Sequence, residues 1–209
     1  RLRRALRPLK RTPKPLIPID GSPMVVRAAN SLPAADKWIF AVRAEHIDHS
    51  QIDRRLASLF SPITVVPVPR LTEGQASTCL LARNFLREDD WLNIGACDNA
   101  MVWNKEKFLS LKNDPNIDAL IWTFRNNPAV LQDPRMYGWV VTEDDSIAKR
   151  VSVKVPISDL PMNDHAVIGA FSFRKAADFL RCADRMINQN RRIKNEFYVD
   201  ELMNVAIED

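Results

Sequence analysis

The chain has 209 residues, which is enough for one sizeable α/β core or two small domains. Hydrophobic residues make up 46% of it, and no apolar run approaches the roughly 20 residues that span a bilayer, which argues against a membrane protein. The three cysteines are scattered and form no C-x-x-C pair, which argues against a disulfide framework or a structural zinc site and favours a reducing cytoplasm.

The positive charge is concentrated at the start of the chain. The first 14 residues carry seven of the 30 basic side chains and no acidic one, whereas the remainder holds 23 basic and 26 acidic residues. Such a segment suits a nucleic-acid arm, a solvated tail or a phosphate-binding loop. It contains no aromatic residue, which counts against a stacking surface for single-stranded nucleic acid. The expected partners include neither nucleic acid nor a membrane, and nucleic-acid binding stays open as an alternative.

Strands and helices alternate through most of the chain. Apolar runs predict strands at 15–19, 37–43, 61–69, 117–125 and 165–174, and at 89–103 a strand that runs into a polar loop. Periodic apolar faces predict helices at 23–32, 50–60, 74–86, 105–113, 175–190 and 197–207. Residues 137–154 predict a hairpin with an acidic turn. This order predicts an α/β fold with a mostly parallel sheet, covered on both faces, and a β-rich insertion near 137–155.

The stretch "TPKPLIPIDGSPMV" places Lys14 between two prolines, directly before the first predicted strand. Proline fixes its own φ and biases the preceding residue towards extended geometry, so Pro13 and Pro15 stiffen the backbone around the lysine. A stiffened cation suggests an anion to be bound. The alternative is a rigid loop with a solvated lysine.

Two further loops hold residues that suit a nucleotide, at the strand ends where open α/β sheets bind ligands. In "RLTEGQAST", Gly74 precedes a helix, whose N-terminus presents unpaired N–H groups to a ligand. The alternative is a plain loop-to-helix turn with Thr72 as N-cap. In "GACDNAM", Asp98 follows a strand end, where a carboxylate suits a hard cation such as Mg²⁺ or serves as a helix cap. Together, the lysine, the glycine and the aspartate form a set that a nucleoside triphosphate and Mg²⁺ require.

Seven stretches then carry a resemblance. They are "PKPLIPIDGSPMV", "LTEGQASTCLLA", "NIGACDNAM", "YGWV", "VKVPIS", "AVIGAFSF" and "EFYVDELMN", in this order. The order resembles the sugar-phosphate nucleotidyltransferase family, over nearly the whole chain from Thr12 onward. The resemblance implies a Rossmann-like, glycosyltransferase-A-like fold with three α/β/α layers and a mixed sheet. It also implies an Mg²⁺-dependent enzyme that joins a nucleoside triphosphate to a sugar 1-phosphate and releases pyrophosphate, as in polysaccharide biosynthesis.

The resemblance also implies roles for individual residues. Lys14 matches the signature lysine that contacts phosphate, and Lys154 a lysine near the sugar phosphate. Glu73, Gly74 and Gln75 fall where the family holds the nucleobase, and Asp98 matches the aspartate that binds nucleotide and Mg²⁺. The sugar side is assigned to Tyr137, Gly138, Asn163, Gly169 and Glu196. Asp200 is the candidate for the second metal ligand, with Asn204 as the fallback.

The chain also departs from the family pattern. No Gly-x-Gly-x-Arg loop precedes Lys14, and we expect Arg1 or Arg4 to be what remains of its arginine, with Arg4 assigned a catalytic role. The expectation is thus a single nucleotidyltransferase domain over 1–209 that lacks its first strand, the glycine-rich loop and a C-terminal end. Val153 stands where the family usually has a glutamate, which leaves the sugar open.

Two other functional classes stay open. The missing glycine loop favours a non-catalytic domain of the same fold that senses a nucleotide or a nucleotide-sugar. The basic start of the chain suggests a nucleic-acid-binding protein, which would bind with a steep salt dependence. Apolar helix faces leave room for a homo-oligomer.

Overall fold

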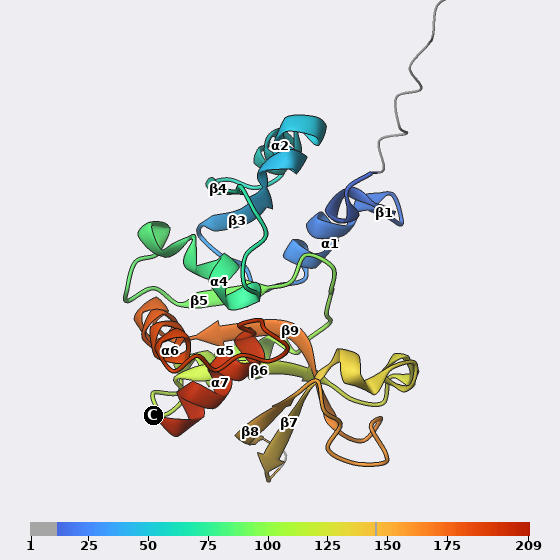
Figure 1. Cartoon of the computed structure of the whole chain (residues 1–209), viewed down its shortest axis with the longest axis vertical. Helices are drawn as coiled ribbons and strands as arrows, with labels where there is room; N and C mark the ends of the chain where they lie inside the picture. Colours follow the sequence, from blue (N-terminus) through green and yellow to red (C-terminus); the bar gives the residue numbers. More distant parts are fainter. Residues whose placement is uncertain (1–11, 145) are drawn as a thin grey trace, which may run out of the picture.

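The computed structural model describes residues 12–144 and 146–209, whose strands form three sheets (Figure 1). The smallest sheet is an antiparallel pair of β1 (Pro18–Ile19) and β2 (Ser22–Pro23). The second sheet is a parallel pair of β3 (Trp38–Arg43) and β4 (Ile63–Val68). The largest sheet consists of β5 (Leu92–Gly95), β6 (Ala119–Phe124), β7 (Gly138–Glu143), β8 (Ile147–Val153) and β9 (His165–Phe173).

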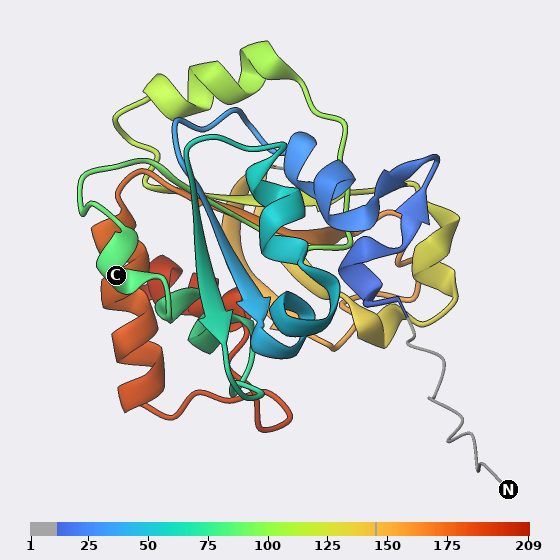
Figure 2. The same cartoon turned by 90° about the horizontal axis from the view of Figure 1, so that it is seen from above.

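Helices surround these sheets. The α-helices are α1 (Met24–Asn30), α2 (Ala44–Ser50), α3 (Ile52–Ala57), α4 (Gln75–Leu80), α5 (Lys105–Asn113), α6 (Ala176–Asn188) and α7 (Val199–Glu208). Short 3-10 helices lie at η1 (Lys14–Leu16), η2 (Arg83–Phe85), η3 (Pro128–Leu131) and η4 (Pro134–Met136). Figures 1 and 2 show α6 and α7 on one side of the largest sheet and α5 on the other. Within the described residues, none of the helices is long and apolar enough to cross a membrane.

β9 is the central strand of the largest sheet. β6 pairs with β9 from Ala166 to Phe173, and β5 pairs with its last four residues. β7 pairs with its first two residues, and the hairpin partner β8 extends the sheet beyond β7. Because β6 shares residues of β9 with both β5 and β7, those two strands must lie on the opposite edge of β9, one after the other.

The prediction of a mostly parallel sheet is wrong for this sheet, in which every strand pair is antiparallel. Among the strands of the described residues, β3 and β4 alone pair in parallel. The α/β class and the hairpin near 137–155 are confirmed. The error has a physical reason: β9 is buried on both faces, so its sequence is a continuous apolar run that is also typical of a parallel strand.

The two largest hydrophobic clusters stabilise the two larger sheets. One packs α1, α3, β3 and β4 together, and its buried members are Leu16, Val25, Val26, Ala29, Val42, Ile52, Leu56 and Phe60. The other joins the largest sheet to α4, α6 and α7, and its fully buried side chains include Phe171, Phe179, Met186, Phe197 and Leu202. The second cluster thus supports the strand ends and the α7 start at which candidate site residues lie.

Three predicted elements are shorter than expected or divided. Residues 15–19 form η1 and only a two-residue strand, because Pro15 and Pro18 lack the N–H groups that a longer strand donates. The helix predicted at 50–60 is the shorter α3, and α2 before it was not predicted; Gln51, with a left-handed φ of 49°, separates the two helices. The segment 74–86 divides into α4 and η2.

A chain of polar side chains crosses three strands of the largest sheet. The indole N–H groups of Trp91 and Trp122 donate to Asn93 Oδ1 (3.0 Å) and Ser172 Oγ (2.9 Å), and Ser172 Oγ donates to Asn93 Oδ1 (2.7 Å). Ser172 has no exposed surface. Phe108 of α5 packs on Trp122, with ring centroids 5.4 Å apart, so α5 covers this face while Phe171 and Phe173 face the opposite core.

Arg174, directly after β9, holds the end of α5. Its guanidinium donates to the carbonyl oxygens of Ile117 (2.8 Å), Lys112 (3.3 Å) and Asp114. A cation that hydrogen-bonds the last carbonyls of a helix stabilises its C-terminus. We expect Arg174→Ala to lower the free energy of unfolding by about 2 kcal/mol, because three carbonyl oxygens lose a charged donor. Urea denaturation measures this.

The adjacent Lys175 provides the matched control for Arg174. Its ammonium pairs with the Asp89 carboxylate (3.3 Å), and both side chains are more than half exposed. Lys175→Ala is expected to change the free energy of unfolding by less than about 0.5 kcal/mol. Equal losses in the two variants would contradict the capping role of Arg174.

Candidate functional site

Lys14 and Asp98, which are 84 residues apart in the sequence, form an ion pair. Lys14 Nζ lies 2.5 Å from Asp98 Oδ2, and the exposed fractions of the two side chains are 64% and 31%. Lys14 is the first residue of η1, and Asp98 lies in the loop after β5. The ion pair therefore joins two short segments of the chain. The hydrogen bond and the charge of Asp98 raise the pKa of Lys14 above its usual value. Two residues that the resemblance assigned to nucleotide binding are thus in contact.

The loop after β5 also brings Asn99 close to Gly169, the residue at which β9 bends. Gly169 has φ +83°, and a Cβ atom there would lie 3.2 Å from Asn99 Nδ2 and 3.4 Å from the Ala96 methyl. The β6–β9 register shifts beside this position, and the Ala96 N–H donates to the Gly169 carbonyl (3.0 Å). A glycine suits this left-handed, crowded position. Asn99 was not predicted, although it directly follows Asp98.

A second group gathers at the start of β7 and the end of β8. Gly138 is so close to Asp200 of α7 that a Cβ atom at 138 would overlap the Asp200 carboxylate. Lys154 Nζ donates to the Met136 carbonyl and lies 5.4 Å from the ring centroid of Tyr198. Burial raises the pKa of Asp200, and the charge of Lys154 opposes that effect. Lys154 and Asp200 therefore interact electrostatically.

The neighbours of this group lie close to its backbone. The Lys154 N–H donates to the Tyr137 carbonyl oxygen (3.1 Å), which ties the end of the hairpin to its beginning. Burial and the neighbouring Glu196 carboxylate raise the pKa of Tyr198. Val153 is buried in the core, which accounts for an apolar residue at the position where the family pattern has glutamate.

The third group joins the loop before α4 to the segment before α7. The Phe197 N–H donates to the Glu73 carbonyl (2.7 Å), and the Ala76 N–H donates to the Phe197 carbonyl (3.0 Å). Gly74 has φ +117°, and a Cβ atom there would lie 2.6 Å from the Phe197 carbonyl oxygen. Thr72 is not the N-cap of α4; Gly74 is, while Thr72 Oγ1 donates to the Gly74 carbonyl (3.2 Å).

Two backbone stretches connect the three groups. Along β9, Gly169 meets Asn99, and Val167 lies 3.2 Å from the position that a Cβ atom of Gly138 would occupy. Along 197–200, Phe197 contacts Gly74, Tyr198 lies beneath Lys154 and Asp200 contacts Gly138. Most of the predicted site residues therefore lie around the bend of β9 and the start of α7.

Other predicted residues lie differently. Arg4 falls outside the described residues. Asn163 is exposed in the loop before β9, and Glu196 is exposed and bridges to Ile193. Gln75, the first residue of α4, is half-buried.

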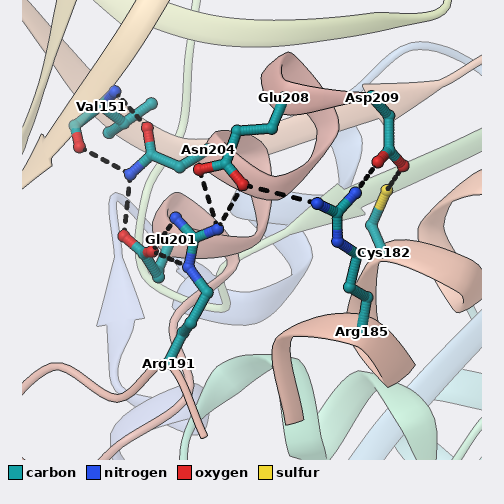
Figure 3. A network of polar contacts seen from close by, with 8 residues as sticks. All are labelled: Val151, Cys182, Arg185, Arg191, Glu201, Asn204, Glu208 and Asp209. Carbon is teal, nitrogen blue, oxygen red and sulfur yellow. Dashed lines mark hydrogen bonds and ion pairs between the residues drawn. The ribbon is translucent and has the colours of Figure 1, made fainter. Parts of the chain in front are cut away.

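Asn204 takes part in a structural network instead of facing a ligand (Figure 3). Its side-chain amide accepts from the Val151 N–H (2.7 Å) and donates to the Val151 carbonyl (2.9 Å), as a neighbouring strand would. It also donates to the buried Glu201 carboxylate (2.8 Å), which Arg191 binds from the other side (2.7 Å). The amide is occupied by these contacts, which favours a structural role for Asn204 over metal binding.

Within 12–144 and 146–209, no group of three or more His, Cys, Asp or Glu side chains is arranged to hold a metal ion. A cation at Asp98 would therefore depend on substrate oxygens and water for most of its ligands. Mg²⁺ commonly binds in this way, with one or two carboxylates from the protein. The single carboxylate of Asp98 thus suits an Mg²⁺ ion whose other ligands come from substrate and water.

The sequence matches no protein-family model and no curated protein. Solved structures do match the fold. A nucleoside-diphosphate-sugar pyrophosphorylase from Vibrio cholerae RC9 has a TM-score of 0.73 at 17% identity, over 95% of this chain and 80% of its own. The inositol-1-phosphate CTP transferase from T. maritima has a TM-score of 0.70 at 12% identity, over 94% and 73%.

A third similar structure comes from Bacillus anthracis and is provisionally assigned as a glucose-1-phosphate thymidylyltransferase, in complex with a sucrose. Its TM-score is 0.67 at 16% identity, over 93% of this chain and 74% of its own. The three names describe enzymes that act on a glucose phosphate, an inositol phosphate or a nucleotide-sugar. In its fold, the chain is therefore similar to the sugar-phosphate nucleotidyltransferases, as its sequence motifs predicted.

Proposed function

We propose that the 209 residues act as one domain of an Mg²⁺-dependent sugar-phosphate nucleotidyltransferase, which joins a nucleoside triphosphate to a sugar 1-phosphate. The observation that carries the proposal is the contact between Lys14 and Asp98, since it unites a cation and a carboxylate from distant segments in a fold shared with such enzymes. The sugar phosphate is assigned to the second group, where Lys154 supplies a cation beside Gly138 and Asp200.

The reaction needs positioning and charge neutralisation more than covalent participation of the protein. An oxygen of the sugar 1-phosphate forms a bond to the α-phosphorus, and the bond from that phosphorus to the oxygen bridging to the β-phosphate breaks, so pyrophosphate leaves. Lys14 faces the triphosphate, and Lys154 holds the attacking phosphate. Glu73, Gly74 and Gln75 present the loop for the base.

Asp98 is the residue that would hold Mg²⁺, which supplies positive charge to the phosphate oxygens when it is bound. Its carboxylate is partly exposed and hydrogen-bonded to Lys14, so a phosphate that attracts Lys14 would free an oxygen for the metal. Asp200 lies half-buried against Gly138, and burial raises the pKa of its carboxyl. Asp98 is the more exposed of the two carboxylates, so the metal proposal depends mainly on Asp98.

The test is pyrophosphate release by the protein with CTP, UTP, dTTP, GTP or ATP against a set of sugar 1-phosphates, with and without Mg²⁺. Release that requires one nucleotide, one sugar phosphate and Mg²⁺ supports the enzyme and identifies both substrates. Nucleotide binding without release in any combination would contradict it and favour the nucleotide-sensing domain.

Thiol labelling gives an independent prediction for this site. Cys97, beside Asp98, is exposed, whereas burial raises the pKa of Cys79 to about 12. At pH 8 only about one Cys79 thiol in 10,000 is ionised, so an alkylating reagent should label Cys97 far faster. Because partial desolvation and the charge of Asp98 raise the pKa of Cys97, its labelling rate should rise with pH up to pH 9 and beyond.

The magnesium–nucleotide complex should slow the labelling of Cys97 at least several-fold. Mass spectrometry after timed alkylation identifies the labelled thiol. Unchanged Cys97 labelling in a protein saturated with nucleotide would place the ligand away from Asp98.

A further inference from the structure

Arg192 is the centre of the loop between α6 and α7. Its Nε donates to Asn190 Oδ1 (2.6 Å) and one terminal nitrogen donates to the Asn195 carbonyl (3.2 Å). The guanidinium also lies 4.1 Å from the ring centroid of Phe197, which is buried. These contacts use both the planar shape and the charge of the arginine.

The remaining terminal nitrogen of Arg192 reaches a different part of the chain. It donates to Glu73 Oε1 at 3.2 Å, across 119 positions of sequence. Glu73 belongs to the loop that also carries Gly74, and both residues contact Phe197 through the backbone. The backbones of the loop before α4 and of Phe197 are already hydrogen-bonded to each other. The Arg192 side chain adds a further contact between these two segments.

The loop that carries Arg192 is itself firmly held. Asn190, Lys194 and Asn195 have left-handed φ values of 52°, 50° and 67°, conformations that persist only when the surrounding contacts hold them. The preceding residue, Arg191, binds Glu201 and Glu208 of α7, and Figure 3 shows this network. Arg191 and Arg192 thus face opposite partners, and the loop is fixed to α7 on one side and to Glu73 on the other.

We infer that Arg192 is a positioning residue for the nucleoside triphosphate, and this inference rests on the proposed function. Arg192 acts through Glu73: it holds the loop 72–75 so that the backbone of Gly74 and Gln75 is preorganised for the base. The Glu73 carboxylate is bound to Arg192, so its contribution to nucleotide affinity is indirect. Preorganisation of a binding loop lowers the ordering cost of binding and so increases affinity.

The test is a double-mutant cycle measured as nucleotide affinity by calorimetry, with Glu73→Ala, Arg192→Met and the double variant. Methionine keeps an apolar stem over Phe197 while removing the charge and the donors. We expect each single variant to raise the Kd of the nucleotide about tenfold and the double variant to be no weaker than Arg192→Met, because the two residues act as one unit. The KM for the sugar 1-phosphate should stay within about twofold.

Hydrogen exchange provides a readout that does not depend on a ligand. The amides of Ala76 and Phe197 are hydrogen-bonded between the two segments, so both should exchange faster in Arg192→Met. Arg83→Met is the matched control, because it removes an exposed pair with Asp184 of α6, and it should leave these amides and the nucleotide Kd unchanged.

Four outcomes would overturn the inference. Wild-type affinity or unchanged exchange in Arg192→Met excludes a positioning role. Losses that multiply to about 100-fold in the double variant would mean that Glu73 contacts the base directly. Each of these three results leaves the proposed function intact, whereas a wild-type protein that binds none of the five nucleotides overturns the proposed function and this inference together.

Discussion

Lys14→Ala and Asp98→Ala are each expected to lower kcat for pyrophosphate release by about 100- to 1000-fold, the typical effect of removing one preorganised charge from a transition state. Lys14 Nζ is 2.5 Å from Asp98 Oδ2, so both side chains are held at one point before the substrate arrives. Initial rates at saturating nucleotide and sugar phosphate measure the loss. Since both residues lie on exposed segments, the free energy of unfolding should change by less than about 1 kcal/mol.

Lys149→Ala is the matched control for this loss of rate. Lys149 also forms an ion pair across a short loop, with Glu143 in the β7–β8 hairpin, and both side chains are more than half exposed. Its replacement should leave kcat within twofold. A loss of tenfold or less in both Lys14→Ala and Asp98→Ala would contradict the assignment of this pair to the reaction.

Gly74→Ala is expected to lower the free energy of unfolding by about 3 kcal/mol or more. The residue has φ +117°, which an L side chain rarely adopts, and the new methyl group would lie 2.6 Å from the Phe197 carbonyl oxygen and 2.7 Å from its nitrogen. Both atoms belong to the backbone and cannot move aside as a flexible side chain would. The two segments must separate, so nucleotide affinity should fall as well.

Gly21→Ala separates the cost of the backbone conformation from that of the overlap. Gly21 has φ +81°, and nothing lies within 4 Å of the position that a Cβ atom would take. The expected loss is about 1 kcal/mol, from conformation alone. Urea denaturation of both variants gives the comparison. Equal losses would show that the approach of Gly74 to Phe197 does not constrain the loop.

The sequence predicts the element types of this fold better than their pairing. The apolar period of α6 and the acidic turn of the hairpin between β7 and β8 are local signals, and both elements form where they were expected. The direction in which β9 pairs is not a local property, because a strand buried on both faces has the same pattern in parallel and antiparallel sheets. The shortness of β1 was predictable from Pro15 and Pro18, which cannot donate hydrogen bonds.

In the candidate site, too, residues of short motifs were predictable from the sequence, whereas contacts between distant segments were not. Lys14 and Asp98 were found because each belongs to a short motif, and the structure brings them together. Arg192 belongs to none of these motifs, and its contact with Glu73 depends on folding across 119 residues. Asn204 resembled a ligand in the sequence because an amide that pairs with a strand edge leaves no signature there.

The polar chain from Trp91 through Asn93 and Ser172 to Trp122 has a consequence for the accuracy of folding. A slip of β9 by one residue would exchange its two faces, which would put the Ser172 hydroxyl among phenylalanines and a phenylalanine among the hydrogen-bonding groups. The same slip would move Gly169 away from Asn99. The same slip of β9 therefore destabilises the core and distorts the site. Chains that fold stably consequently also carry a correctly assembled site.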